Sequence, residues 1–339
     1  MNKSGPTIFD RRRFLSGTTA LSAASILGWP KISRAEPPPE TKKLRLVHAP
    51  AICLAPQYLA EELFRLEGFS EIEYVDGQNI PGPQLIADGK ADISMWETPS
   101  LIPALDQQKP ITLLAGVHAG CYELFGNDRV HAIRDLKGKT VAVFALGGGD
   151  HILVSSMLAY VGIDPNKHVR WISGNSLSEA MRLFVDGKED EFVGFEPQHQ
   201  ELRLRKIGHV IVNTAQDKPW SQYFCCQVMG NRDWVRKNPI GTKRALRAIL
   251  KSADICASDP QRVARYLKEK GIESRYEIAL DVLQSLPYAR WRDSNPEDTL
   301  RFHALRLHEV GMIKTHPNKL IAQGTDWRFL NELKKELKA

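Results

Sequence analysis

Two glutamates stand at corresponding places in the chain and could receive a positively charged or N–H-rich group. Each follows an aromatic residue and shortly precedes a proline, in segments 96–99 (Trp-Glu-Thr-Pro) and 195–197 (Phe-Glu-Pro). A carboxylate beside an aromatic ring suits an ammonium or a polarised N–H group. The alternative for Glu97 and Glu196 is to cap the helix that follows, where a carboxylate satisfies free N–H groups. A carboxylate pair for glycosidic chemistry has no other support in the sequence.

A glycine run at 147–151 (Gly-Gly-Gly-Asp-His) lies between a predicted strand and a predicted helix. Glycines allow a ligand to approach the backbone, and free N–H groups at a helix start favour an anion. The spacing matches neither the dinucleotide-binding pattern nor a P-loop, so it does not indicate a nucleotide. A plain flexible turn is the alternative, with Asp150 capping the helix and His151 in a structural role.

The chain has five cysteines, an odd number without metal-type spacing, so no disulfide framework is predicted. The adjacent pair Cys225 and Cys226 suits neither ordinary disulfide geometry nor a zinc site. We expect the cysteines to act as small hydrophobic residues and predict neither a metal nor a cofactor.

The elements that must position these residues alternate between strands and helices up to about residue 230. Such alternation with short connections predicts an α/β protein with mainly parallel sheets. Beyond residue 230 the chain reads as helices broken by prolines. The predicted strands are 44–48, 72–75, 92–95, 111–117, 140–144, 169–172, 192–195 and 210–212, and the main helices are 58–66, 152–161, 177–185 and 198–206.

An internal echo links the two glutamate segments. Residues 85–92 (LIADGKAD) are matched by residues 183–190 (LFVDGKED), and each segment leads through a strand to its aromatic-glutamate pair. In both, glycine after a helical run suits the left-handed cap that ends a helix. The echo predicts two similar lobes that present loops at the carboxyl ends of their strands, where ligands of open α/β sheets bind.

The first 35 residues have the pattern of an export signal. Arginines at 11–13 precede Phe14 and Leu15, a short uncharged stretch follows, and Ser-Arg-Ala at 33–35 offers a cleavage site. Paired arginines before Phe-Leu indicate a twin-arginine-type signal peptide at 1–35. Six basic residues and one acid give this segment a net charge of +5, which leaves about +1 of the chain's +6. The basic balance therefore does not predict a nucleic-acid partner.

Several motifs together resemble a known family. They are Ala-Pro-x-Tyr-Leu-Ala at 55–60, the Asp-Ile-Ser strand at 92–94 running into Thr98-Pro99, and Asp-Leu-Lys-Gly-Lys-Thr-Val-Ala at 135–142. The segment 43–230 resembles the solute-binding proteins of ABC importers of the nitrate, sulfonate and taurine type, which include binders of thiamine-pyrimidine precursors.

The resemblance implies a two-lobed periplasmic-binding-protein fold (type II) with a helix-rich C-terminal part. Lobe 1 would comprise 43–120 plus 230–339, lobe 2 would comprise 121–229, and crossovers would lie near 121–127 and 223–229. The predicted ligand-binding residues, on loops of the cleft or close to it, are Pro50, Cys53, Trp96, Glu97, Thr98, His118, Tyr122, Gly148, Gly149, Asp150, His151, Phe195, Glu196, Trp220 and Tyr223.

The same resemblance implies a non-enzymatic, monomeric receptor in the periplasm. It would capture a small organic solute between its lobes and deliver it to an ABC permease. Members that bind simple oxyanions need no acids in the cleft, so Glu97 and Glu196 favour an amino-sulfonate, an amine or a pyrimidine.

Two alternatives remain open. One is an enzyme of the thiamine-pyrimidine synthase type on the same fold, although that family's cysteine-rich iron motif is matched here only by Cys225-Cys226. The other is an accessory protein that uses the same cleft to sense a ligand.

Overall fold

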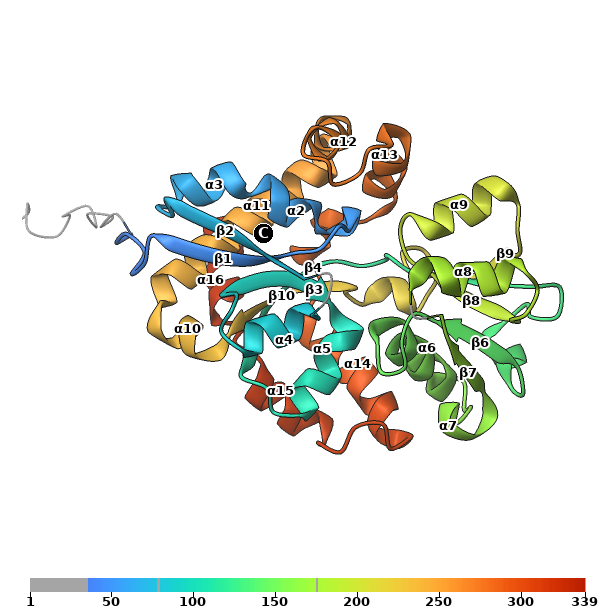
Figure 1. Ribbon diagram of the computed structural model, residues 1–339. Coiled ribbons are helices and arrows are strands. Elements are labelled where there is room, and N and C mark those ends of the chain that lie inside the picture. Colours follow the sequence, from blue (N-terminus) through green and yellow to red (C-terminus); the bar gives the residue numbers. More distant parts are fainter. Residues whose placement is uncertain (1–35, 78–79, 175, 339) are drawn as a thin grey trace, which may run out of the picture. The chain divides into compact units, whose positions relative to one another are not determined.

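The structure is a computed structural model that describes residues 36–77, 80–174 and 176–338 (Figure 1). The fold below is that of the compact unit Pro38–Ala339. The predicted signal peptide at 1–35 lies outside the described residues. No helix of the described segments is long and apolar enough to cross a membrane.

The first strands form two small sheets. Strand β1 (Lys43–His48) pairs in parallel with β2 (Glu71–Asp76). The second sheet has the order β3-β10-β4, in which β10 runs antiparallel to both neighbours. Its strands are β3 (Ile93–Glu97), β10 (Cys226–Asn231) and β4 (Ile111–His118).

The middle of the chain forms a five-stranded sheet of order β7-β6-β8-β5-β9. Strand β6 is parallel to β7 and β8, whereas β5 is antiparallel to β8 and β9. Figure 1 shows α6 to α9 gathered around this sheet. Its strands are β5 (Glu123–Gly126), β6 (Thr140–Val143), β7 (Arg170–Ser173), β8 (Glu191–Gly194) and β9 (His209–Asn213).

The α/β prediction is confirmed, but the expectation of mainly parallel sheets is wrong. The chain enters the five-stranded sheet through β5 and returns to the three-stranded sheet through β10, and both strands insert antiparallel. These antiparallel pairs join strands that lie far apart in the sequence. The periodicity and length of a strand in the sequence do not reveal its direction in the sheet.

The helices end where the sequence pattern predicts in the two echoed segments. Gly89 follows α4 and Gly187 follows α8, and both have a positive φ, +68° and +70°. Each glycine cap is followed by the predicted strand, β3 or β8. The structural echo is therefore real at the level of helix, cap and strand.

After β10 the described chain is helical, as expected, apart from an isolated β-bridge between Leu113 and Thr325. In this part Trp291 and Tyr288 are fully buried, and α11 packs on α2 and α16. The helices are α2 (Ala55–Leu59), α3 (Glu61–Leu66), α4 (Gly82–Ala87), α5 (Thr98–Asp106), α6 (Gly149–Tyr160), α7 (Pro165–His168), α8 (Leu177–Val185), α9 (Gln198–Arg205), α10 (Arg232–Lys237), α11 (Pro239–Ser258), α12 (Pro260–Glu269), α13 (Tyr276–Ser285), α14 (Pro296–Glu309), α15 (Pro317–Gly324) and α16 (Arg328–Glu336), with single 3-10 turns η1 (Ile52–Leu54), η2 (Ile133–Leu136), η3 (Trp220–Gln222) and η4 (Tyr288–Trp291).

Candidate functional site

A cavity of about 180 Å³ lies at the carboxyl ends of β1, β3, β6 and β8. This is where the strand order of an α/β protein places its ligands. Among the lining residues, all within the described segments, there are four aromatic rings and two carboxyl groups but no Lys, Arg or His. The lining residues are Ala49, Ala51, Cys53, Leu54, Trp96, Glu97, Tyr122, Phe144, Gly149, Asp150, Leu177, Phe195 and Cys226.

A buried glutamine holds the loop after β1 beside β3. The Gln57 amide donates to the Val47 carbonyl at 2.8 Å, and its oxygen accepts from the Met95 N–H at 2.8 Å. The Ser94 hydroxyl also donates to that oxygen at 2.8 Å. Because Gln57 is fully buried, these bonds fix the spacing between the cavity's loop and the strand that ends in Glu97.

Glu97 caps a helix, as one of the two expectations had it, and it also lines the cavity. Its Oε2 accepts from the Ser100 N–H at 3.0 Å, and its Oε1 accepts from the Ser100 hydroxyl, so it is the N-cap of α5. The same carboxyl also lines the cavity. Desolvation, opposed in part by the Ser100 hydrogen bonds, raises its pKa from 4.5 to about 7.

Asp150 supplies the second carboxyl, at the start of α6. It accepts hydrogen bonds from the Phe144 N–H and, at 2.9 Å, from the His151 N–H. Burial raises its pKa from 3.8 to about 6 despite these bonds. Two N–H groups at this loop and helix start are therefore bonded to the protein's own carboxylate, which disfavours an incoming anion.

Gly149 brings the two acids together. A Cβ at this position would lie 2.6 Å from Glu97 Oε1 and 2.9 Å from Ser100 Oγ. The start of α6 thus approaches the start of α5 so closely that only glycine fits without a shift. Helix α14, from the C-terminal part of the chain, also packs against α6.

Glu196 lies outside the cavity lining, although it reaches the same loop. Its Oε1 accepts from the Cys53 N–H at 2.8 Å, and its buried Oε2 has no hydrogen-bond partner in the described structure. Burial raises its pKa well above the usual range. Its contact therefore joins the loop after β8 to the loop after β1, and the two echoed glutamates have different surroundings.

The structure brings seven of the predicted residues into the cavity lining and leaves eight outside it. Inside are Cys53, Trp96, Glu97, Tyr122, Gly149, Asp150 and Phe195. Outside are Pro50, Thr98, His118, Gly148, His151, Glu196, Trp220 and Tyr223.

The residues outside have identifiable contacts. Thr98 donates its hydroxyl to the Phe224 carbonyl at 3.0 Å, and the His151 ring meets the Trp171 ring edge-on. Trp220 and Tyr223 line a separate small cavity. Six further lining residues were not among the predicted ones: Ala49, Ala51, Leu54, Phe144, Leu177 and Cys226. Ala51 and Leu54 lie in the loop 50–56 after the first strand, which the family resemblance places at the cleft, and Phe144 ends a predicted strand directly before the glycine run.

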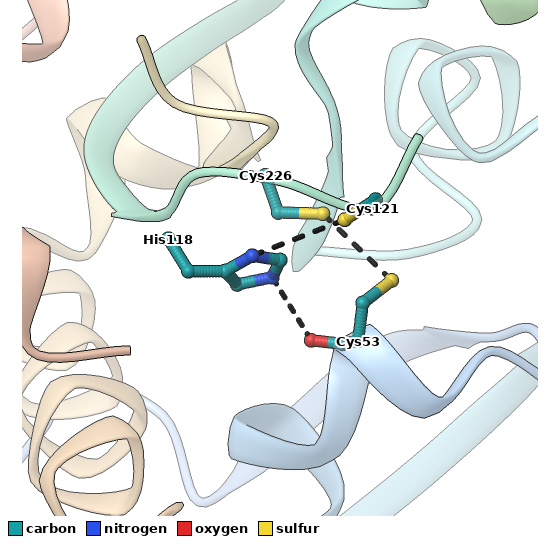
Figure 2. Close-up of side chains that lie close together, drawn as sticks. All are labelled: Cys53, His118, Cys121 and Cys226. Carbon is teal, nitrogen blue, oxygen red and sulfur yellow. Dashed lines mark hydrogen bonds between the residues drawn. The ribbon is translucent and has the colours of Figure 1, made fainter. Parts of the chain in front are cut away.

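A second group of residues adjoins the cavity, whose lining includes two of its members, and has metal-binding chemistry. The side chains of Cys53, His118, Cys121 and Cys226 converge in Figure 2, and all four are buried. Desolvation raises the pKa of the Cys53 and Cys121 thiols well above the usual value and lowers that of His118 to about 4. Three thiols and an imidazole could hold a thiophilic metal ion.

Sequence reasoning missed this group because its members come from three segments. Cys53 is in η1, His118 ends β4 with Cys121 just beyond, and Cys226 begins β10. The three-residue spacing of His118 and Cys121 is too short a motif to indicate a metal site, and Cys53 and Cys226 join them only in the folded protein.

Comparison with solved structures defines the class of the fold. The periplasmic nitrate-binding protein NrtA from Synechocystis PCC 6803 matches with a TM-score of 0.72 and 17% identity over 89% of this chain and 90% of that one. The alkanesulfonate-binding protein SsuA from Xanthomonas axonopodis pv. citri, bound to MOPS, matches with a TM-score of 0.68 and 15% identity over 86% and 99%. The chain thus has the periplasmic-binding-protein fold, as predicted.

The family follows from the sequence. Residues 54–263 match the model described as NMT1/THI5 like, and the chain belongs to this family. A relative is the 4-amino-5-hydroxymethyl-2-methylpyrimidine phosphate synthase THI5 of Saccharomyces cerevisiae, 24% identical over 191 residues. The match covers 52% of this chain and 55% of the yeast protein, so the chain spans about half the length of that relative.

Proposed function

We propose that the chain is the periplasmic, non-enzymatic solute-binding component of an ABC importer for a small organic amine or an N–H-rich heterocycle such as a pyrimidine. The observation that carries this proposal is the cavity lining: Glu97 and Asp150 line an aromatic-walled cavity, and none of the described residues in its lining is basic. Donor groups on a flat ligand would bind the two carboxylates, and its ring would stack on the aromatic walls.

The charge of the cavity decides between solute classes. A nitrate or sulfonate group needs N–H donors or a cation. The lining residues that the structure describes include no basic side chain, and Asp150 already accepts from the N–H groups of Phe144 and His151. An anion would also face carboxyl groups that are partly ionised near neutral pH. Of the two solute groups expected from sequence, the amine or pyrimidine is therefore favoured over the amino-sulfonate.

The transport role rests on the fold and on the predicted export signal. In this proposal residues 43–120 plus 230–339 form one lobe and residues 121–229 form the other. A solute that contacts both would favour the closed form, which the permease recognises. The receptor would act as a monomer in the periplasm after export through the twin-arginine-type signal at 1–35.

A second candidate is a thiamine-pyrimidine synthase-like enzyme, favoured by the yeast relative and by the cysteine–histidine group that adjoins the cavity. Turnover of a substrate by the purified protein would support this candidate. Stoichiometric binding without turnover would support the receptor.

The test is a tryptophan-fluorescence titration, because Trp96 lines the cavity. The panel would contain aminopyrimidines, primary amines, taurine, an alkanesulfonate and nitrate. We expect saturable binding of an aminopyrimidine or amine, weakened at least about tenfold by Glu97→Gln and by Asp150→Asn through loss of a charge-assisted hydrogen bond.

Glu97→Gln keeps an oxygen for the Ser100 N–H, so the cap of α5 is preserved. Glu269→Gln, at the exposed end of α12, is the matched control and should leave affinity unchanged. Tight binding of nitrate or the alkanesulfonate, with no effect of either cavity variant, would refute the proposal.

A further inference from the structure

Four buried side chains from separate segments point their donor atoms at one another. The Sγ atoms of Cys53, Cys121 and Cys226 and a ring nitrogen of His118 all lie within 4.8 Å of one another (Figure 2). Three soft sulfur donors and one imidazole make a set that matches structural zinc sites of the Cys3His type.

The spacing of the donors is close to that of a tetrahedral site. A Zn–S bond of about 2.3 Å places two sulfur ligands of a tetrahedron about 3.8 Å apart. The Cys53 and Cys226 Sγ atoms are 3.9 Å apart, and Cys121 Sγ lies 3.9 Å from His118 Nδ1. The other pairs need to contract by at most about 1 Å, a change within reach of thiol rotation and small loop shifts.

The imidazole of His118 carries an independent signal. Its Nε2 lies 3.1 Å from the Cys53 carbonyl, and its Nδ1 lies 3.0 Å from the Ala119 carbonyl. Both carbonyls are acceptors, yet a neutral imidazole donates through only one nitrogen. If Nε2–H donates to Cys53, the Nδ1 lone pair needs another partner, and Nδ1 is the nitrogen that faces Cys121 Sγ.

This arrangement is the one found around metal-bound histidines. A ligating imidazole usually donates its other N–H to a carbonyl or carboxylate, which fixes the ring and its tautomer. Here the Cys53 carbonyl would accept that N–H, while the Tyr288 hydroxyl lies 3.4 Å from the same oxygen. Tyr288 also packs edge-on against the imidazole and shields it.

The backbone at Cys121 is shaped to aim its thiol at this point. Cys121 has φ +77°, directly after Gly120 with φ +96°. A side chain in the left-handed region is uncommon outside Gly, Asn and Asp, and such conformations are enriched at binding and active sites. The turn sets Cys121 three residues after His118, so that both donors face the thiols of η1 and β10.

We infer that Cys53, His118, Cys121 and Cys226 form a closed, four-coordinate site for one thiophilic divalent ion of the zinc class. The site would tie the loop after β1 to the chain between β4 and β5 and to the start of β10. It would form the floor of the solute cavity, because Cys53 and Cys226 line that cavity as well. This inference does not depend on which solute the cavity binds.

The test uses the reduced mature protein with Zn²⁺ and Co²⁺ as probes and Mg²⁺ as a negative control. We expect one equivalent of Zn²⁺ by native mass spectrometry, a higher melting temperature on its addition, and a thiolate-to-cobalt charge-transfer band with Co²⁺. Cys226→Ala should abolish stoichiometric binding and the band. Cys256→Ala removes an equally buried thiol from α11, outside the cluster, and should leave both unchanged.

Two results would overturn the inference. One is correctly folded, reduced wild-type protein that binds no Zn²⁺ and shows no charge-transfer band with Co²⁺; this readout does not require any variant to fold. The other is a Cys53–Cys226 disulfide in protein isolated from its own cells, because those thiols would then be consumed.

Discussion

At the scale of single residues, burial opposes the ionisation of the two carboxyl groups in the cavity, those of Glu97 and Asp150. Raising the pKa of Asp150 from 3.8 to about 6 corresponds to an ionisation cost on the order of 3 kcal/mol. Glu97 is shifted in the same direction, to about 7. A bound cation or N–H donor would offset this cost, which links ligand binding to proton release.

The first prediction is a pH dependence of stability. Because both pKa values are higher in the folded state, the folded protein holds more protons than the unfolded chain between about pH 4 and 7. The contribution of these acids to the free energy of unfolding is therefore fully present below about pH 4 and falls as pH rises through this window. Urea unfolding of Asp150→Asn should show a smaller decline than the wild type, whereas exposed Asp128→Asn should match the wild type. Equal slopes in all three proteins would contradict the buried-acid account.

A second residue-scale prediction concerns the ligand. The affinity for an amine that stays protonated throughout should rise between pH 5 and 8, since Glu97 and Asp150 become ionised over that range. Calorimetry in buffers of different ionisation enthalpy would report the released protons. A flat affinity profile, with no proton release, would mean that these carboxyls do not contact the ligand's charge.

At the scale of elements, the close approach of α5 and α6 builds the cavity. Gly149→Ala should lower the free energy of unfolding by about 1–3 kcal/mol, because the new methyl group would meet Glu97 Oε1 and Ser100 Oγ. Helix propensity alone predicts the opposite sign. Gly241→Ala in α11 is the control: its nearest neighbour would be Glu40 Oε2 at 3.4 Å, and it should be neutral or stabilising. If both substitutions raised the free energy of unfolding in denaturant, the start of α6 would not be in tight contact with Glu97 and Ser100.

The elements were predictable from sequence to the extent that each has a local cause. The strand–helix alternation, the glycine caps at Gly89 and Gly187 and the helical C-terminal part all follow from period and turn chemistry. The antiparallel insertion of β5 and β10 did not, because strand direction within a sheet depends on contacts between distant segments.

The sequence predicted part of the candidate site and missed the part that depends on contacts between distant segments. Glu97 and Phe195 lie at strand ends that the echo marks, and both line the cavity. Glu196 has a similar local sequence, but its carboxylate accepts from the Cys53 N–H and does not line the cavity. The sequence predicted the cysteines to be small hydrophobic residues. Cys53, Cys121 and Cys226 become neighbours only in the folded chain, where η1 lies close to the ends of β4 and β10.

At the scale of the whole molecule, the unit Pro38–Ala339 contains a mainly apolar cavity lined by two carboxyl groups. Its fold is shared with nitrate- and sulfonate-binding proteins. Fold similarity at such low identity does not carry a ligand over, since function resides in the site. Our proposal of a nitrogen base over an oxyanion therefore rests on the lining residues and not on the fold.

The most direct test is native mass spectrometry of the protein isolated from the periplasm of its own cells, with the mass of any co-purifying molecule determined. The account predicts a single bound solute per chain that carries an amine or an N–H-rich heterocycle. A co-purified nitrate or alkanesulfonate, without such a nitrogen group, would contradict it.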